Sequence, residues 1–432
     1  MNRTTPGLSR RGFLQITGAT GLAAAVTACG AGGSSSGGST GKLTVLCESG
    51  GHAELTKIAA AFKKQTGHGV TFVELPYDGL YNRLNSELSA GSVSFDLAAL
   101  DAIWLPTFAN ALQPLDDLFT SAVRADLFPS LVDGARIKGK YVGMPAWTNT
   151  EILFYRRDLF ENAAEKAAFQ KKYGYELAPP KTWQQFQDTA SFFTRGTKLY
   201  GTDVKGAVET EWLAHVLQAG SPGVVLDDSG KVIIDNAQHV AALKFYSDLN
   251  NRLKVSPPGA AQMDWAGAQN LFNQGKTAMM RFWAHAYPLI PKDSPVHGKV
   301  GVAPMIEGSA GIGAIPGPYY LSIPNAGKNN DLAKQFIKFA YDNNKLAIDS
   351  SLGLAARKSA YTAYAGKPGY EHFKALLTTL DGPATKSRPA SPKWQQIVDT
   401  VLVPTIQKSL TAGADYAALL AKARQEVERL VQ

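Results

Sequence analysis

Cysteine is scarce in this sequence: Cys29 and Cys47 are the only two among 432 residues. Two cysteines allow at most one disulfide, so cross-links cannot organise a chain of this length. Metal-ligand motifs are missing as well, because the seven histidines are scattered and no H-E-x-x-H motif or close cysteine pair occurs. We therefore expect neither a metal centre nor any other cofactor.

Concentrated charge is also missing. The chain carries 44 basic and 36 acidic residues, a formal net charge of +8, and no run of Lys or Arg is longer than two residues. Nucleic-acid binding needs a basic patch, so it is not expected here. No G-x-x-x-x-G-K-[ST] phosphate loop occurs, and "GIGAIPG" (311–317) has Pro316 where a dinucleotide fingerprint has its third glycine.

A long apolar run is the third absence. The most apolar stretch, residues 13–28, has 16 residues, whereas a membrane-spanning helix needs roughly 20. Arg3, Arg10 and Arg11 precede it, which is typical of a secretory signal peptide. In "SRRGFL" (9–14) the arginine pair stands before an aromatic residue, as in twin-arginine export signals. An ordinary signal with an accidental arginine pair is the alternative.

The signal region, residues 1–28, runs into "VTAC" (26–29), which resembles a bacterial lipobox. The resemblance implies that Cys29 becomes the first mature residue and carries lipid, which would hold the protein on the extracytoplasmic face of a bacterial cell membrane. An unmodified signal-peptide cysteine is the alternative. Residues 29–41 would then be a Gly/Ser linker with the composition of a flexible coil.

The remaining residues, from 42 onward, exceed what one hydrophobic core normally serves, so two lobes are expected. Strand patterns alternate with helical spacing of apolar residues that begins at Ala53 and at Tyr77. This alternation predicts an α/β fold with a largely parallel sheet in the first lobe. The predicted strands are 42–47, 70–75, 95–100, 299–305 and 319–324, and the later predicted helices are 235–250, 265–275, 331–343 and 393–431.

Three polar or aromatic residues follow the predicted parallel strands. Glu48 comes after the first strand, and Asp101 with Trp104 comes after the third. Ligands of open α/β sheets bind beyond the carboxyl ends of the strands, so these residues are candidates to line a ligand site. The alternative for Asp101 is that it caps the helix that follows.

Seven segments follow one another in a specific order and spacing. They are "KLTVL" (42–46), "FDLAALDAIWLPTFANALQPLDDLF" (95–119), "KGKYVGMPAWTNTEILFYRRDLF" (138–160), "PKTWQQF" (180–186), "FNQGKTAMM" (272–280), "LSIPNAGKNNDLAKQFIKF" (321–339) and "GLAARKSAY" (353–361). Together they resemble extracellular solute-binding proteins of family 1, the maltose-binding-protein-like receptors of ABC importers. The resemblance covers nearly all of residues 42–432.

The resemblance implies a periplasmic-binding-protein-like fold of type II, with two α/β lobes, three crossings and a ligand cleft between the lobes. Mapped by order, the crossings lie near residues 147–152, 302–305 and 353–357. Lobe one would be residues 42–148 plus 306–352, and lobe two would be residues 149–305 plus 353–432. The implied function is that of a non-catalytic, monomeric receptor that captures a carbohydrate-like solute and delivers it to an integral-membrane permease.

Sugar recognition requires aromatic faces for the C–H patches of the ring and polar partners for its hydroxyls. Mapping onto the family adds six candidates to Glu48, Asp101 and Trp104. They are Trp147 on the first crossing, Glu209 on a helix resembling a ligand-contact helix, Trp265, Trp283, Tyr319 and Arg357 on the third crossing. Each has a structural alternative, which is packing for the tryptophans and a surface carboxylate partner for Arg357.

Two other functions stay open at this stage. In a receptor for glycerol-phosphate-type esters, Arg281 and Arg357 would meet the phosphate. A secreted glycan-active enzyme would need two carboxylates placed about a glycosidic bond. The sequence marks out no such pair of acids, and the resemblance over the whole chain is to receptors.

Overall fold

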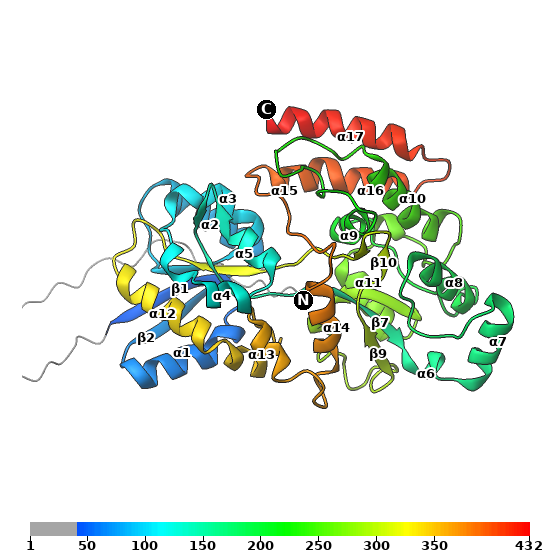
Figure 1. The fold of residues 1–432 in the computed structure, drawn as a ribbon, viewed down its shortest axis with the longest axis horizontal. Coiled ribbons are helices and arrows are strands. Elements are labelled where there is room, and N and C mark those ends of the chain that lie inside the picture. The colour runs from blue at the N-terminus through cyan, green and yellow to red at the C-terminus, as the bar shows by residue number, and fades with distance from the viewer. Residues whose placement is uncertain (1–40) are drawn as a thin grey trace, which may run out of the picture. The chain divides into compact units, whose positions relative to one another are not determined.

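Two separate β-sheets form the frame of the chain (Figure 1). The computed structural model describes residues 41–432, so the predicted signal peptide, Cys29 and the linker up to residue 40 lie outside the described residues. The first sheet has the strand order β2-β1-β3-β12-β6, and the second has the order β8-β7-β9. Two short hairpins, β4–β5 and β10–β11, complete the strands of residues 41–432.

The strand bounds are β1 (Lys42–Glu48), β2 (Gly69–Leu75), β3 (Leu97–Asp101), β4 (Arg136–Ile137), β5 (Lys140–Tyr141), β6 (Met144–Trp147), β7 (Glu151–Arg156), β8 (Met279–Trp283), β9 (Val300–Ala303), β10 (Glu307–Gly308), β11 (Gly311–Ile312) and β12 (Tyr319–Ser322). The helix bounds are α1 (Ala53–Thr66), α2 (Tyr77–Ser89), α3 (Leu105–Phe108), α4 (Ser121–Asp126), α5 (Pro129–Ala135), α6 (Arg157–Phe160), α7 (Ala163–Tyr173), α8 (Trp183–Phe193), α9 (Thr210–Gln218), α10 (Ala237–Asn251), α11 (Trp265–Asn273), α12 (Asn330–Asp342), α13 (Lys358–Thr362), α14 (Glu371–Leu380), α15 (Trp394–Ile397), α16 (Val403–Ser409) and α17 (Tyr416–Val431). Short 3₁₀ turns are η1 (Ala102–Trp104), η2 (Ala109–Ala111), η3 (Asp116–Leu118), η4 (Ala260–Gln262), η5 (Ala284–Ala286) and η6 (Asn344–Asp349).

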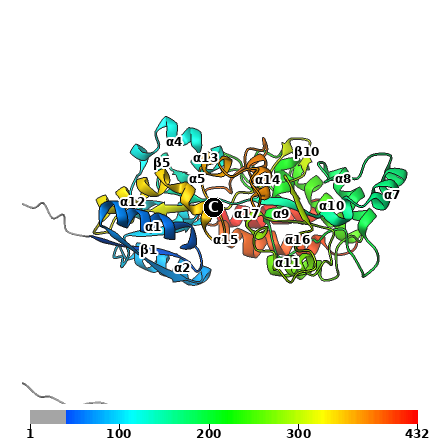
Figure 2. The ribbon, with the colours of Figure 1, turned by 90° about the horizontal axis from the view of Figure 1, so that it is seen from below.

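The first sheet is mostly parallel, as the alternation of strands and helices predicts. β1 runs parallel to both β2 and β3, whereas β12 runs antiparallel to β3 and to β6. α1 and α12 lie side by side (Figures 1 and 2), and Phe62 of α1 meets Phe336 of α12 edge-on with ring centroids 5.2 Å apart. α1 ends at Gly67, whose φ of 78° is the left-handed conformation that a helix-terminating glycine adopts readily.

The second sheet is entirely antiparallel and is covered on both faces. α14 packs against β7 and β9, where Ile152 and Phe154 of β7 are fully buried. Leu153 points to the other face, because successive residues of a strand alternate sides, and it joins the buried cluster that contains Phe186 of α8 and Trp212 of α9. The strand positions that bear Glu151, Leu153 and Tyr155 therefore face the helices that carry much of the second lobe.

The predicted helix at 393–431 is broken into pieces. α15 and α16 are joined by a π-helical turn, η7 (Val398–Leu402), and α17 starts only at Tyr416. Pro404 explains the π turn, because proline has no N–H and its ring clashes with the carbonyl four residues earlier. Gly413, with a φ of 75°, lies in the turn between α16 and α17.

The chain passes between the sheets first at residues 148–150, which join β6 to β7. The sequence mapping placed the second passage at 302–305 and gave residues from 306 onward to lobe one. In the structure the β10–β11 hairpin lies against α9, where the Ala310 N–H donates to the Gln218 carbonyl over 2.9 Å. The passage to β12 therefore lies after Ile312, and the exact lobe boundaries stay a prediction. None of the helices in residues 41–432 has the length and apolar character required to cross a membrane.

Candidate ligand-binding site

Four of the predicted site residues lie at one edge of the first sheet. Glu48 ends β1 and Asp101 ends β3, while Tyr319 begins β12 opposite both Asp101 and Trp147. The Tyr319 hydroxyl donates to a Glu48 carboxylate oxygen, and its ring stacks on Trp147 with centroids 5.0 Å apart and an interplanar angle of 14°. The topology thus brings two carboxylates and a stacked aromatic pair together.

Asp101 has two hydrogen-bond partners in this edge. One carboxylate oxygen accepts from the Tyr77 hydroxyl at 3.1 Å, and the other accepts from the Ile103 N–H at 3.2 Å. The second bond caps η1, so the capping role that the sequence left open is present. Burial raises the pKa of Asp101, and the guanidinium of Arg388 acts in the opposite direction. Burial has the larger effect, so the pKa of Asp101 is raised overall.

Trp104 does not present an open face. It is 2% exposed, and its ring packs against Tyr77 at 4.5 Å and Tyr81 at 5.7 Å between centroids. Since Tyr77 is the residue that donates to Asp101, Trp104 supports the site from within the core. Its placement is the core packing that is the structural alternative to ligand contact for this tryptophan.

Arg388 is a central residue of the site that the sequence reasoning missed. It lies on the segment between α14 and α15, and its guanidinium is 3.5 Å from the Glu209 carboxylate just before α9. Its positive charge also lowers the pKa values of Asp101 and Tyr77, which belong to the lobe of the first sheet. Arg388 therefore forms an ion pair with Glu209 and is near enough to Asp101 to lower the pKa of that carboxyl group. No strand end or motif marks it, since the one local signal is the loop "KSRPASP" (386–392).

Trp265 and Trp283 form a second aromatic pair on the second sheet's side. Trp283 ends β8, Trp265 opens α11, and their ring centroids lie 5.6 Å apart at 55°. Trp283 approaches Gly317 so closely that a Cβ there would lie 3.1 Å from the indole. The Gly317 N–H donates to the Asn149 carbonyl at 2.9 Å, which ties the segment before β12 to the first crossing. Trp283 therefore lies where the two lobes meet.

The structure does not bring Arg357 to this site. Its guanidinium binds Asp126 at 2.6 Å, donates to the Tyr341 carbonyl at 3.1 Å and lies over the Tyr341 ring at 4.6 Å. These partners join α4, α12 and the start of α13, and none of them is Glu48, Asp101, Trp147 or Tyr319. The surface-carboxylate partner considered for Arg357 is therefore present, and we leave Arg357 out of the proposed site.

The assembled groups suit a polyhydroxylated ligand. Carboxylates accept hydrogen bonds from hydroxyls, a guanidinium donates to them, and aromatic faces pack against C–H patches. Within residues 41–432 no group of three or more His, Cys, Asp or Glu side chains is placed to hold a metal ion.

Comparison with known proteins gives consistent results. Residues 49–344 match the family described as "Bacterial extracellular solute-binding protein". A probable ABC transporter-binding protein of Deinococcus radiodurans is 28% identical over 330 residues, which are 72% of this chain and 74% of that protein. The maltose-bound MalE3 structure from T. maritima aligns with a TM-score of 0.71 and 26% identity over 90% of this chain and 99% of that one. A solute-binding protein of Agrobacterium radiobacter in complex with ribitol aligns with a TM-score of 0.71 and 25% identity over 90% and 98% of the two chains.

Proposed function

The chain belongs to the bacterial extracellular solute-binding protein family, and on that premise we propose that it is the substrate-binding receptor of an ABC importer. It captures a carbohydrate, meaning a sugar, a short oligosaccharide or a polyol, between its two lobes. It then presents the closed form to an integral-membrane permease and performs no chemistry on the solute. The fold is the two-lobe fold of maltose-binding-like proteins, which suits capture by lobe closure.

The row of Glu48, Asp101, Tyr319 and Trp147 is the observation that carries this proposal. It places two acceptors for hydroxyl groups beside a stacked pair of aromatic rings, at the edge where such sheets bind ligands. Trp265 and Trp283 add a second aromatic surface from the other lobe. The names of the maltose-bound and ribitol-bound relatives support the same class of solute.

A phosphate ester is the second candidate, and the placement of the cations argues against it. Arg281 is fully buried within an ion cluster, and Arg357 is engaged by Asp126. Arg388 already forms an ion pair with Glu209 and acts on the pKa of Asp101. A dianionic phosphate would meet more negative than positive charge, so a neutral solute is favoured.

Thermal unfolding of the purified protein against sugars, polyols, glycerophosphodiesters and amino acids tests the proposal. A ligand present at about 100 times its dissociation constant adds roughly 2.7 kcal/mol of stability, which raises the unfolding temperature visibly. We expect a rise with one class of neutral carbohydrate. A rise only with phosphate esters would establish the second candidate, and slow consumption of a glycan without any rise would point to an enzyme.

Two substitutions locate the site once a solute is found. We expect Trp283→Ala and Asp101→Ala each to weaken binding by about tenfold or more, which corresponds to at least roughly 1.4 kcal/mol. Isothermal titration calorimetry measures the loss. Wild-type affinity in both variants would remove these two residues from the site.

We also propose that the protein is a lipid-anchored monomer on the extracytoplasmic face of a bacterial cell membrane. The support is the sequence before the described residues, with its arginine pair and the lipobox-like "VTAC" ending at Cys29. Metabolic labelling with a fatty-acid analogue should mark the wild-type chain and leave Cys29→Ser unlabelled and released from membranes. Equal labelling of both chains would contradict modification at Cys29.

A further inference from the structure

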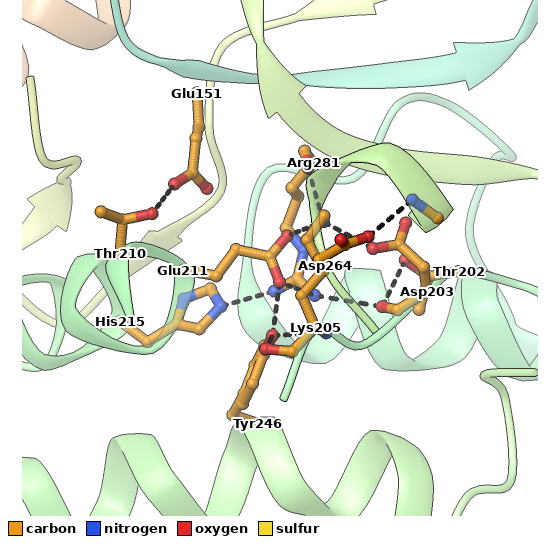
Figure 3. A network of polar contacts seen from close by, with 11 residues as sticks. Glu151, Thr202, Asp203, Lys205, Thr210, Glu211, His215, Tyr246, Asp264 and Arg281 are labelled. Atoms are coloured by element: carbon orange, nitrogen blue, oxygen red, sulfur yellow. Dashed lines mark hydrogen bonds and ion pairs between the residues drawn. The ribbon is translucent and has the colours of Figure 1, made fainter. Parts of the chain in front are cut away.

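A cluster of buried charges lies in the second lobe (Figure 3), and one of its members, Lys205, is in contact with the ring of Trp265. We call it the Lys205 cluster; its members are Asp203, Lys205, Glu211, Tyr246 and Arg281, all buried in the second lobe. They come from the segment before α9, from α9, from α10 and from β8. Elements far apart in the sequence therefore meet at one set of polar side chains, next to an aromatic residue of the proposed site.

Lys205 is fixed by three acceptors. Its ammonium donates to Asp203 at 2.5 Å, to Glu211 at 2.6 Å and to the Arg281 backbone carbonyl at 2.9 Å. An ammonium has three hydrogens, so this geometry uses all of them. Burial lowers the pKa of Lys205, but the carboxylates of Asp203 and Glu211 outweigh burial and raise it overall. The ammonium form of Lys205 is therefore favoured, and its three hydrogen bonds hold the side chain in a single position.

That charge lies against the indole of Trp265. The Lys205 ammonium is 5.0 Å from the Trp265 ring centroid, within the range of a cation–π contact. Phe282 meets the same indole edge-on at 5.1 Å, and Trp283 lies 5.6 Å away. The Trp265 side chain is only half-buried, so part of its indole stays accessible to solvent.

The cluster reaches Trp283 through strand β8. Arg281 precedes Trp283 by two residues, so both side chains point to the same face of the strand. The Arg281 guanidinium is held by the ring of His215 at 2.5 Å and by Glu211 at 3.5 Å. Fixing Arg281 thereby fixes the face of β8 that presents Trp283.

Stability alone is a poor explanation for this arrangement. Removing ions from water is costly, and well-packed apolar side chains of similar volume often stabilise a fold as well or better. The cluster instead fixes α9, α10 and β8 relative to one another, next to Trp265 and Trp283. We propose that Lys205 is a positioning residue of the solute site, which holds Trp265, and with it Trp283, in the orientation that receives the solute. This inference rests on the proposed solute-binding function.

The test is the double variant Asp203→Asn with Lys205→Met, in the full-length protein. It removes one positive and one negative charge together and leaves the Glu211–Arg281 pair in place. The matched control is Asp248→Asn with Lys244→Met, which makes the same chemical change in an ion pair of 2.7 Å whose lysine is 58% exposed. Binding of the solute identified by the thermal screen is measured by calorimetry well below the unfolding temperature.

A second readout needs no solute. The emission of Trp265 is obtained as the difference between each protein and its own Trp265→Phe derivative. We expect the double variant to bind about tenfold more weakly and to show a shifted Trp265 emission, while the control binds within about twofold of wild type. Unchanged affinity, or unchanged emission, in a folded double variant overturns the proposal.

Tyr246→Phe provides a milder variant if the double variant does not fold. It removes only the hydroxyl that donates to Glu211 at 2.6 Å, and it leaves every charge in place. We expect weaker binding by about threefold with a shifted Trp265 emission, and wild-type values for both overturn the proposal. If wild-type protein binds no solute in the screen, the proposed function fails, and the emission comparison still decides whether Lys205 sets the environment of Trp265.

Discussion

The ring of Tyr319 lies nearly parallel to the indole of Trp147, with centroids 5.0 Å apart, while its hydroxyl donates to Glu48. One tyrosine therefore joins an aromatic surface to a carboxylate across three strands of the first sheet. Burial raises the pKa of Glu48, and the hydrogen bond from Tyr319 lowers it. Removal of the hydroxyl leaves a partly buried carboxylate without its donor.

We therefore expect Tyr319→Phe to lower the free energy of unfolding by about 1–2 kcal/mol and to weaken solute binding. Urea denaturation gives the first quantity and calorimetry the second. Tyr416→Phe is the control, because the Tyr416 hydroxyl makes no hydrogen bond within residues 41–432. Equal stability of Tyr319→Phe and wild type would show that the Glu48 contact is not maintained in solution.

Substitution of Arg388 should weaken solute binding, whereas substitution of Arg357 should lower stability only. Arg388→Met removes the cation that pairs with Glu209 and lowers the pKa of Asp101, so we expect binding to weaken by about tenfold or more. Arg357→Met breaks the ion pair with Asp126, which is 2.6 Å long and away from the site. It should lower the unfolding temperature and leave the affinity within about twofold of wild type. Calorimetry on both folded variants decides, and a reversed pattern would return Arg357 to the site.

Buried histidines predict a loss of stability in acid. Burial lowers the pKa of His215 to about 3 and the pKa values of His285 and His372 to about 4, from an ordinary value of 6.5. The unfolded chain takes up these protons below pH 6.5 while the folded chain resists them. The stability that these three histidines contribute is therefore full above pH 6.5 and falls as the pH drops toward 4.

His372→Gln should flatten this profile by about 3 kcal/mol between pH 6.5 and pH 4. The exposed His297, changed to Gln, is the control and should leave the profile as it is. Unfolding temperatures measured at half-unit steps of pH provide the comparison. A variant profile that overlays the wild-type one would mean that His372 takes up its proton in the folded protein.

Glu151 predicts the opposite dependence on the alkaline side. Its side chain is 1% exposed, one oxygen accepts from the Thr210 hydroxyl at 2.7 Å, and burial together with Glu211 raises its pKa to about 8 from 4.5 (Figure 3). The folded chain thus holds a proton that the unfolded chain loses above pH 4.5. The stability due to this proton is present below pH 4.5 and is lost as the pH rises to about 8.

Glu151→Gln keeps an acceptor for Thr210 and cannot ionise. We expect it to be more stable than wild type at pH 8–9, on the order of 3 kcal/mol, and nearly equal to it at pH 5. Glu176→Gln, at a side chain that is 71% exposed, is the control. Denaturant titrations at the two pH values test this, and a variant less stable than wild type at both would show that Glu151 is ionised.

Local signals in the sequence predicted much of the fold. The apolar spacing that begins at Ala53 and the following Gly67 delimit α1, because a helix with one apolar face and a terminating glycine needs no distant partner to be recognised. Glu48 and Asp101 were found for a similar reason, since both directly follow parallel strands. Trp147 and Tyr319 entered through the family resemblance, and the strand register places Tyr319 opposite both Asp101 and Trp147.

The remaining features depend on contacts between distant residues. Arg388 meets Glu209 across nearly half the chain, and nothing within its own loop indicates that partner. The partner of Arg357 is also distant in the sequence, because Asp126 lies 231 residues before it, and no local pattern around Arg357 indicates this ion pair. The β10–β11 hairpin is held on α9 by backbone hydrogen bonds. Such bonds do not depend on residue type, so the sequence carries no signal for this contact.

The position of β12 has a consequence for the newly made protein. β12 lies between β3 and β6, yet its residues follow the entire second sheet in the chain. A growing polypeptide that has reached residue 318 holds β3 and β6 without the strand that joins them. Open strand edges recruit other chains, and pairings between distant residues form late. We expect the nascent chain to depend on chaperones until translation has passed β12, and fragments that stop short of it to aggregate.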